Sequence, residues 1–314
     1  MTTTKKEKYL KPSLNFQEQL EKLKKRGLII TNEVLALDVL SNINYYRLSA
    51  YWLPFKQRDK YGNLLEQFQE NVSLENILEL YEFDRKLRLL IMDALERIEI
   101  SIRTHITYHL ADCYGPFALN NSRNFHNKFD HKTWLLQGQD EIKRSKEPFI
   151  EHYMNKYEGF PNLPVWMATE VTSFGSISFL YKGLKNEDKR AIARKHYNLH
   201  PKTLANFLHF LTYVRNICAH HSRLWNKELA IRPTLEGLNE LWHPPITPRN
   251  DRSFFILITL KYLLNESETT SIWLNTYREL ILPILNKYQW SADSMGLPKN
   301  WQSHPILALK KSIS

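Results

Sequence analysis

The longest regular pattern in the sequence is helical, and it restricts the fold more than any other feature. From Leu74 to about Leu110, apolar side chains recur at intervals of three and four residues, as on one face of an α-helix. Charged side chains between Asp84 and Arg103 fill the other positions and predict a solvated face with ion pairs one turn apart. With only 9 glycines in 314 residues, a turn-rich β architecture is disfavoured. We therefore expect an all-α protein.

Shorter helical patterns flank this long one. Asn15 or Ser13 is expected to cap a helix through Arg26, and Asn32 a second helix. Two closing helices are expected over Arg252–Leu264 and from Ile272 to about Leu282, the second ending near Pro283. The turn QRDKYG (57–62) marks the first boundary. We expect an N-terminal helical segment over residues 1–68, a main helical domain over 69–288 and a C-terminal tail over 289–314.

The charge of the chain indicates a polyanionic partner. The formal net charge is +10, which favours association with nucleic acid. Two cysteines are too few for a disulfide framework or a cysteine-based zinc site. The most apolar window, Phe254 to Leu264, is interrupted by Lys261 and is shorter than the roughly 18 residues that cross a bilayer. We expect a cytoplasmic protein that does not enter a membrane.

The stretch from Phe207 to Asn226, FLHFLTYVRNICAHHSRLWN, carries the candidate chemistry. An apolar helical run, expected to begin near Pro201, is followed by polar groups suited to phosphate binding and proton transfer: Arg215, Asn216, His220, His221 and Arg223. Arginine has a rigid fork of donors that matches a phosphate. Histidine can act as a general acid or base near neutral pH. Asparagine can orient either neighbour by hydrogen bonding.

The spacing from Arg215 to His220 is by itself only a weak indication of a site. An arginine followed after four to six residues by a histidine also occurs in three other pairs: Arg103 with His109, Arg190 with His196, and Arg194 with His200. The context of Arg215 is different, because Asn216 follows it directly and the small residues Cys218 and Ala219 come before the two histidines.

The full string RNxxAHHxRLWN resembles the Abi family of bacterial abortive-infection proteins, in its AbiD/AbiF-like group. Its arginine-x4-histidine element is similar to the signature of the wider HEPN superfamily of helical ribonucleases. Three further blocks are similar to the family in the same order: NINYYRLSAYWLPF (42–55), LYEFDRKLRLLIMDALERIEISIR (80–103) and LPVWMATEVTSFGSISFLYKGL (163–184).

The resemblance implies a helical bundle of HEPN type with an additional N-terminal helical segment. It also implies an endoribonuclease of phage defence that needs no metal or other cofactor. Arg215 would bind the phosphate, His220 would transfer protons, and Asn216 would hold one of them in register. Because the chain has one good copy of the element, the resemblance implies a homodimer with a composite active site. A toxin of this kind needs restraint, so we also expect a neutralising RNA or protein partner.

Further cationic side chains are candidates for RNA binding. The segment from Lys182 to Lys202 is rich in cations and is the best local candidate for a surface that follows a phosphate backbone. The candidates are His221, Arg223, Lys189, Arg190, Arg194 and Lys195. A plain solvated helix face is the competing interpretation of the segment, and His221 can instead be structural.

The sequence is also compatible with other functions. The protein can be a non-catalytic RNA- or protein-binding module of HEPN type in a defence or toxin–antitoxin system. A metal-dependent hydrolase using His220 and His221 is a weaker hypothesis, because adjacent helical residues point about 100° apart. The aromatic stretch Asn42–Phe55 can stack RNA bases, but we favour a packed core there.

Overall fold

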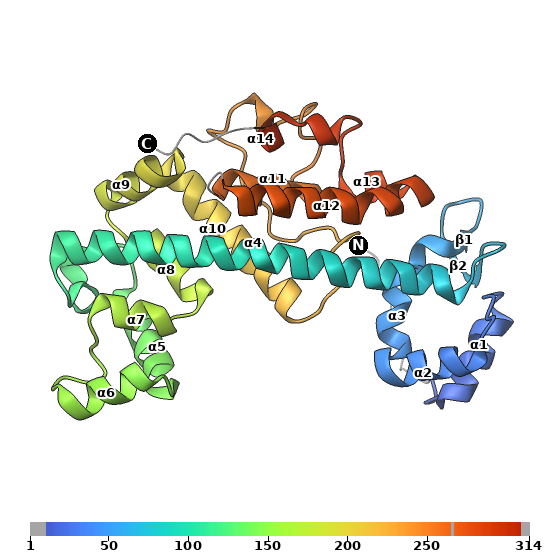
Figure 1. The fold of residues 1–314 in the computed structure, drawn as a ribbon, viewed down its shortest axis with the longest axis horizontal. Helices are drawn as coiled ribbons and strands as arrows, with labels where there is room; N and C mark the ends of the chain where they lie inside the picture. Colours follow the sequence, from blue (N-terminus) through green and yellow to red (C-terminus); the bar gives the residue numbers. More distant parts are fainter. Residues whose placement is uncertain (1–10, 265–266, 309–314) are drawn as a thin grey trace, which may run out of the picture. The chain divides into compact units, whose positions relative to one another are not determined.

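The computed structural model describes residues 11–264 and 267–308, and their regular structure is almost entirely helical (Figure 1). Its α-helices within these ranges are α1 (Phe16–Lys25), α2 (Glu33–Ile43), α3 (Tyr45–Trp52), α4 (Leu74–Tyr114), α5 (His131–Arg144), α6 (Pro148–Lys156), α7 (Val165–Val171), α8 (Phe174–Gly183), α9 (Asn186–Tyr197), α10 (Pro201–Ala219), α11 (Ser253–Leu263), α12 (Glu268–Lys287), α13 (Ser291–Met295) and α14 (Pro305–Ala308). The predicted all-α class is confirmed. The described strands, β1 (Lys56–Arg58) and β2 (Leu64–Phe68), form one antiparallel hairpin.

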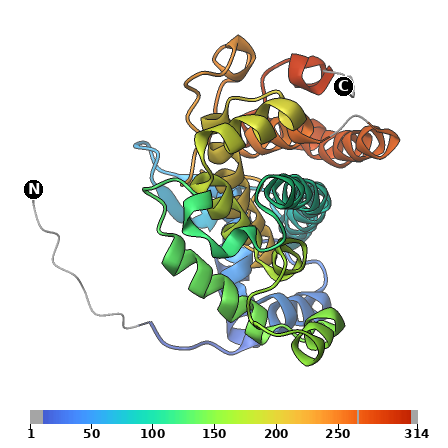
Figure 2. The ribbon, with the colours of Figure 1, turned by 90° about the vertical axis from the view of Figure 1, so that its left-hand side faces the viewer.

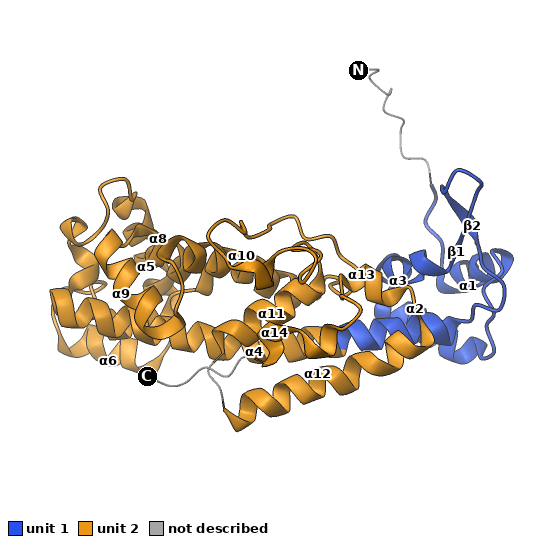
Figure 3. Cartoon of the chain, turned by 90° about the horizontal axis from the view of Figure 1, so that it is seen from above, with its two compact units in different colours: residues 1–85 blue, residues 86–314 orange. Residues whose placement is uncertain are grey.

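The chain divides into two compact units, Met1–Arg85 and Lys86–Ser314 (Figure 3). The long helix α4 begins in unit 1 and continues in unit 2. The motif RNxxAHHxRLWN lies entirely in unit 2.

Local capping chemistry sets the helix boundaries of unit 1. The Asn15 side chain accepts a hydrogen bond from the Glu18 amide at 2.9 Å, and the Glu18 carboxylate accepts from the Asn15 amide at 2.7 Å. This reciprocal pair is a capping box, and it fixes the start of α1. Asn32 caps α2 by accepting from the Leu35 amide. Both predicted helix starts are confirmed.

The aromatic stretch of unit 1 is mostly packed, in agreement with the interpretation that the sequence favoured, although Tyr46 is 85% exposed. Tyr51 and Trp52 are buried, and the ring of Tyr45 meets Trp52 edge to face at 4.9 Å between centroids. The hairpin that follows was not predicted as a pair of strands. The turn between the two strands was predicted, and Asp59 stabilises it by accepting hydrogen bonds from the Tyr61 and Asn63 amides.

Helix α10 lies at the centre of unit 2, where it packs against α8, α9 and α11. It begins at Pro201, as predicted, because proline is well suited to a first helical turn. Its buried side chains are Thr203, Leu204, Phe207, Leu208, Phe210, Leu211, Val214, Ile217 and Cys218. Helix α11 is buried on nearly all sides, which explains why its sequence is the most apolar in the chain.

The part of α4 that belongs to unit 2 is joined to its neighbours there by polar contacts, and Figure 2 looks along this helix. The Trp273 indole of α12 donates to the Leu90 carbonyl at 2.7 Å. The Arg103 guanidinium donates to the Thr169 and Glu170 carbonyls at the end of α7 and pairs with Glu99 at 2.7 Å. Arginine at a helix C-terminus satisfies carbonyls that have no partner within the helix.

The prediction of a solvated charged face on α4 was therefore wrong in part. Arg88 is only 5% exposed, and Arg103 is largely covered by α7. The pattern of charges does not reveal that other helices cover this face. The helix also continues four residues beyond the predicted end near Leu110, and it stops before Gly115, which has a φ of 80°.

Two further helix boundaries are the break between α7 and α8 and the end of α12. Helices α7 and α8 are separate, because the Ser173 side chain caps α8 by accepting from the Ser176 amide. The prediction that α12 ends near Pro283 is wrong, because the helix runs on to Lys287. A proline in a helix removes one backbone hydrogen bond, and the apolar contacts of Ile281 and Ile284 on either side compensate for that loss.

The described part of residues 289–314 is packed. Met295, Trp301 and Ile306 are all buried, and α14 contacts α11. Among the described helices, none has a stretch both long and apolar enough to cross a membrane.

The central position of α10 gives a test of this core. Leu208→Ala should lower the free energy of unfolding by about 2–5 kcal/mol, because Leu208 is fully buried and its loss leaves a cavity. The matched control is Leu89→Ala on α4, where the side chain is 58% exposed and the expected loss is about 0.5 kcal/mol. Denaturant unfolding of both variants measures the difference, and equal losses would contradict the assigned core.

Candidate functional site

The motif RNxxAHHxRLWN lies at the C-terminal end of α10. The helix ends at Ala219, and His220 is its C-cap residue. The His221 amide then donates to the Cys218 carbonyl and the Ser222 amide to the Ile217 carbonyl, both at 3.0 Å. These two bonds form a Schellman motif, which reverses the chain and satisfies the last carbonyls of the helix.

His221 occupies the position of this motif where glycine is most common. Its φ is 55°, in the left-handed region that side chains with a Cβ rarely adopt. The strain is of order 1 kcal/mol, and strained residues of this kind cluster at functional sites. The next apolar side chains, Leu224 and Trp225, are fully buried, and Trp225 packs against Trp290 at 5.6 Å between centroids. These anchors hold the reversed chain in place.

The side chains of the motif are presented on the surface. Asn216, His220 and His221 are exposed, whereas Arg215 and Arg223 are partly covered. The Arg215 guanidinium donates to the Asn216 side-chain oxygen at 3.4 Å. Among the described residues, the His220 ring makes no hydrogen bond, although its backbone amide donates to the Asn216 carbonyl at 3.0 Å. Asn216 therefore contacts the side chain of Arg215, and its bond to His220 belongs to the helix backbone.

Helix geometry explains this arrangement. Asn216 and His220 are four residues apart and differ by about 40° around the helix axis, so they share one face. Arg215 starts about 140° away from His220. Only a long side chain can turn back toward that face, and the contact between Arg215 and Asn216 shows that it does. The structure thus brings Arg215 and Asn216 together and leaves His220 free beside them.

Sequence reasoning missed Arg88, which supports the motif from α4. Its guanidinium donates to the Ser222 carbonyl at 3.5 Å, within the chain reversal that follows His221. A signal was present in the sequence, because Arg88 is in phase with Ile91, Leu95 and Ile98 on the buried stripe of α4. A charged side chain in such a stripe must find a buried partner.

The predicted RNA-binding cations of α9 differ in exposure. Arg190, Arg194 and Lys195 are exposed, whereas Lys189 is partly covered and donates to the Lys182 carbonyl. Burial, and then the charge of Lys182, lower the pKa of Lys189. The end of α9 leads directly into the start of α10, so these cations adjoin the end of α10 opposite to the motif (Figure 1). At 1.5 Å per residue, α10 separates its two ends by about 27 Å.

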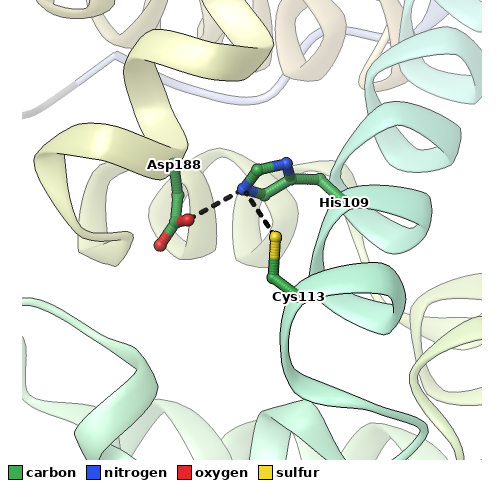
Figure 4. Close-up of side chains that lie close together, drawn as sticks. All are labelled: His109, Cys113 and Asp188. Atoms are coloured by element: carbon green, nitrogen blue, oxygen red, sulfur yellow. Dashed lines mark hydrogen bonds and ion pairs between the residues drawn. The ribbon is translucent and has the colours of Figure 1, made fainter.

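A second polar cluster joins the end of α4 to α9, and no sequence motif predicted it. His109 Nε2 lies 2.8 Å from Asp188 Oδ1 and 3.8 Å from Cys113 Sγ (Figure 4). The Tyr114 hydroxyl donates to Asp188 Oδ2 at 2.8 Å. Desolvation, followed by the nearby Asp188 and Asp112 carboxylates, raises the pKa of the exposed Cys113 thiol.

One turn earlier on α4, two histidines from different helices stack. The rings of His105 and His196 lie 3.7 Å apart and nearly parallel, and His105 Nδ1 is 3.0 Å from the Tyr197 hydroxyl. Burial, followed by the charges of His196 and Lys195, lowers the pKa of His105 to about 4. These contacts attach α9 to α4.

Comparison with known proteins identifies the family. The model of a family described as "Abi-like protein" matches residues 38–226, more than half of the chain. The chain belongs to this family. The match ends at Asn226, so it includes the whole motif of this Abi-like protein. No curated protein and no solved structure matched the chain.

The backbone of the motif gives the next test. In this Abi-like protein, His221→Gly should be more stable than His220→Gly by about 1 kcal/mol, because only position 221 has a positive φ. The two substitutions remove the same side chain at adjacent exposed positions, so each controls for the other. Thermal and denaturant unfolding measure the difference. Equal stability, or the reverse order, would contradict the chain reversal at His221.

Proposed function

We propose that this Abi-like protein is an abortive-infection endoribonuclease of HEPN type, related to the AbiD/AbiF-like group. One observation carries the proposal: Arg215, Asn216 and His220 lie together at an exposed, well-anchored helix end. They supply a phosphate ligand, an orienting amide and a proton-transfer group. The protein would act in the cytoplasm against RNA during phage infection and arrest growth of the infected cell.

The proposed reaction needs no metal ion. The 2′ oxygen of one nucleotide attacks the adjacent phosphorus, and the bond from phosphorus to the 5′ oxygen of the next nucleotide breaks. His220 removes the proton of the 2′-hydroxyl as a general base, or gives a proton to the leaving 5′ oxygen as a general acid. Arg215 stabilises the charge that grows on the phosphate oxygens. The products are a 2′,3′-cyclic phosphate and a 5′-hydroxyl.

The charge of the protein supports RNA as the substrate. The chain carries a net charge of +10, and Arg190, Arg194 and Lys195 are exposed on α9. The α9 cations would bind phosphates remote from the scissile bond, since α9 adjoins the far end of α10, whereas Arg223 would bind a phosphate near it. His221 would contact RNA beside His220. A neutralising RNA or protein partner would mask the same surfaces before infection.

We further propose that two chains form one composite active site. Each chain contributes one Arg215, one Asn216 and one His220, and their side chains lie on the surface rather than in an enclosed cavity. Two copies related by a two-fold axis would place one motif opposite the other. One His220 could then serve as base and the other as acid, with the phosphate between the two arginines.

A docking module is the second candidate, and one observation favours it. Among the described side chains, none hydrogen-bonds to the His220 ring, and such a bond usually orients a catalytic histidine. Catalytic hydrogen bonds can form only in the substrate complex. The two candidates differ in whether RNA is cut or only bound.

Substitution of His220 tests the proposed chemistry. His220→Ala should reduce RNA cleavage by about 10²–10⁴-fold, the contribution typical of a general acid or base, and Arg215→Ala should reduce it as well. The matched control is His209→Ala, at an exposed position of the same helix. Cleavage of a labelled RNA is measured without added Mg²⁺ or Mn²⁺, together with sequencing of new 5′-hydroxyl ends. A substrate with a 2′-deoxynucleotide at the cut site should remain intact. RNA binding without cleavage by the wild type would favour the docking module instead.

The composite site requires a dimer. Light scattering after size-exclusion chromatography should give twice the chain mass of 37.4 kDa. In addition, Asn216→Arg should weaken association, because it places two further cations at the proposed two-fold axis. Asn155→Arg, at an exposed position on α6, adds the same charge and is the control. A wild-type monomer that cleaves RNA would refute the composite site but leave the chemistry standing.

A further inference from the structure

We infer that His109, Cys113 and Asp188 form a zinc site that fastens α9 to the C-terminal end of α4. The three side chains supply one nitrogen, one sulfur and one carboxylate oxygen, and these atoms lie within 4.8 Å of one another (Figure 4). Zinc accepts this combination of ligands. The site is independent of the proposed ribonuclease centre.

Two of the three spacings between the ligand atoms are close to those around a tetrahedral ion. Zinc binds nitrogen and oxygen at about 2.0–2.2 Å and sulfur at about 2.3 Å, so two ligand atoms of one tetrahedral ion lie roughly 3.3–3.8 Å apart. His109 Nε2 and Cys113 Sγ are already 3.8 Å apart. His109 Nε2 and Asp188 Oδ1 are 2.8 Å apart, and a small rotation of the carboxylate opens the remaining half ångström.

The backbone places the ligands with little freedom. His109 and Cys113 are four residues apart on α4, so their side chains lie on the same face in successive turns. Asp188 comes from the first turn of α9, which packs on this part of α4 through His105, His196 and Tyr197. Two rigid helices thus supply the three ligands, and a bound ion would link them directly.

The buried carboxylate of Asp188 has hydrogen bonds but, among the described side chains, no lysine or arginine partner. Asp188 is only 4% exposed, and a buried carboxylate is costly unless it is paired. Among the described residues, the one side chain within ion-pair distance of it is His109, which is charged only when protonated. No described lysine or arginine forms an ion pair with it. A divalent cation between Asp188, His109 and Cys113 meets this requirement without a protonated histidine.

An outer hydrogen bond orients the carboxylate. The Tyr114 hydroxyl donates to Asp188 Oδ2 at 2.8 Å, which leaves Oδ1 facing His109. Metal-binding carboxylates usually have such a partner on the oxygen that does not face the ion. Cys113 is exposed, so water can reach the site and supply the fourth ligand.

The proposed role is structural. Arg88 donates to the Ser222 carbonyl, so the chain reversal that follows His221 contacts α4 at this point. His109 lies about 30 Å further along the same helix. An ion at His109 therefore does not touch the phosphate of the proposed reaction. It would instead hold in place α9, which carries the exposed cations Arg190, Arg194 and Lys195.

Cobalt is the probe for the ligand set. Co²⁺ added to the metal-free full-length protein should give a sulfur-to-metal charge-transfer band and the intense visible bands of a tetrahedral ion, at one equivalent, and Zn²⁺ should remove them. Cys113→Ser should abolish the charge-transfer band. Cys218→Ala removes the other cysteine and should leave the band unchanged. No band in the wild type, or a band that survives Cys113→Ser, would overturn the proposal.

Zinc affinity and stability give a second readout. In a Zn²⁺ titration, Tyr114→Phe should bind the ion about 10–100-fold more weakly than the wild type, because the ligand Asp188 loses the hydrogen bond from Tyr114. Zn²⁺ should raise the Tm of the wild type and not that of Cys113→Ser. If the wild type and Cys113→Ser bind Zn²⁺ with equal affinity, the four side chains form only a hydrogen-bonded joint between α4 and α9, and the zinc site is overturned. RNA cleavage by Cys113→Ser should persist, so failure of this proposal and failure of the nuclease are distinguishable.

Discussion

The burial of α10 is the constraint on which the rest of unit 2 depends. Apolar side chains along most of this helix are removed from water against α8, α9 and α11, and this burial is the main favourable contribution to folding. The last turn is different, because Asn216 and His220 face solvent. A well-packed helix therefore carries its polar end as a fixed structure, with Leu224 and Trp225 buried directly after it. Reactive groups held by a rigid element are positioned more accurately than groups on a free loop.

Polar groups between the helices determine how α4 is used. Arg88 satisfies the carbonyl of Ser222, Arg103 satisfies the last carbonyls of α7, and His109 meets Asp188 of α9. Each of these side chains has left water and has gained a partner from another helix, which a buried polar group requires. The single long helix is consequently a common support for the motif loop, for α7 and for the cationic helix α9.

The two clusters differ in the physical task that their side chains can perform. At the end of α10, the imidazole of His220 is exposed and unpaired among the described residues, as is suitable for a group that must reach a substrate. At the end of α4, His109 and Asp188 are engaged with each other, and Tyr114 completes the contact. Exposure without a partner favours chemistry on an external ligand, whereas mutual contact between two helices favours a fixed joint. His220 and His109 each follow an arginine at a similar spacing in the sequence, and only their surroundings distinguish them.

The sequence by itself determined the helical class, the length of α4 to within a turn, and several helix starts, at Asn15, Asn32 and Pro201. These features depend on residues within one or two turns of each other, through apolar periodicity, capping and the geometry of proline. It also located the motif at the end of α10 and the family to which the chain belongs.

Only the tertiary structure decided that Arg88 and Arg103 are covered, that α12 passes through Pro283, and that Asp188 meets His109 and Cys113. Each of these outcomes depends on which distant helix lies against the residue. Periodicity specifies that a face is buried, but it does not specify the partner that covers it.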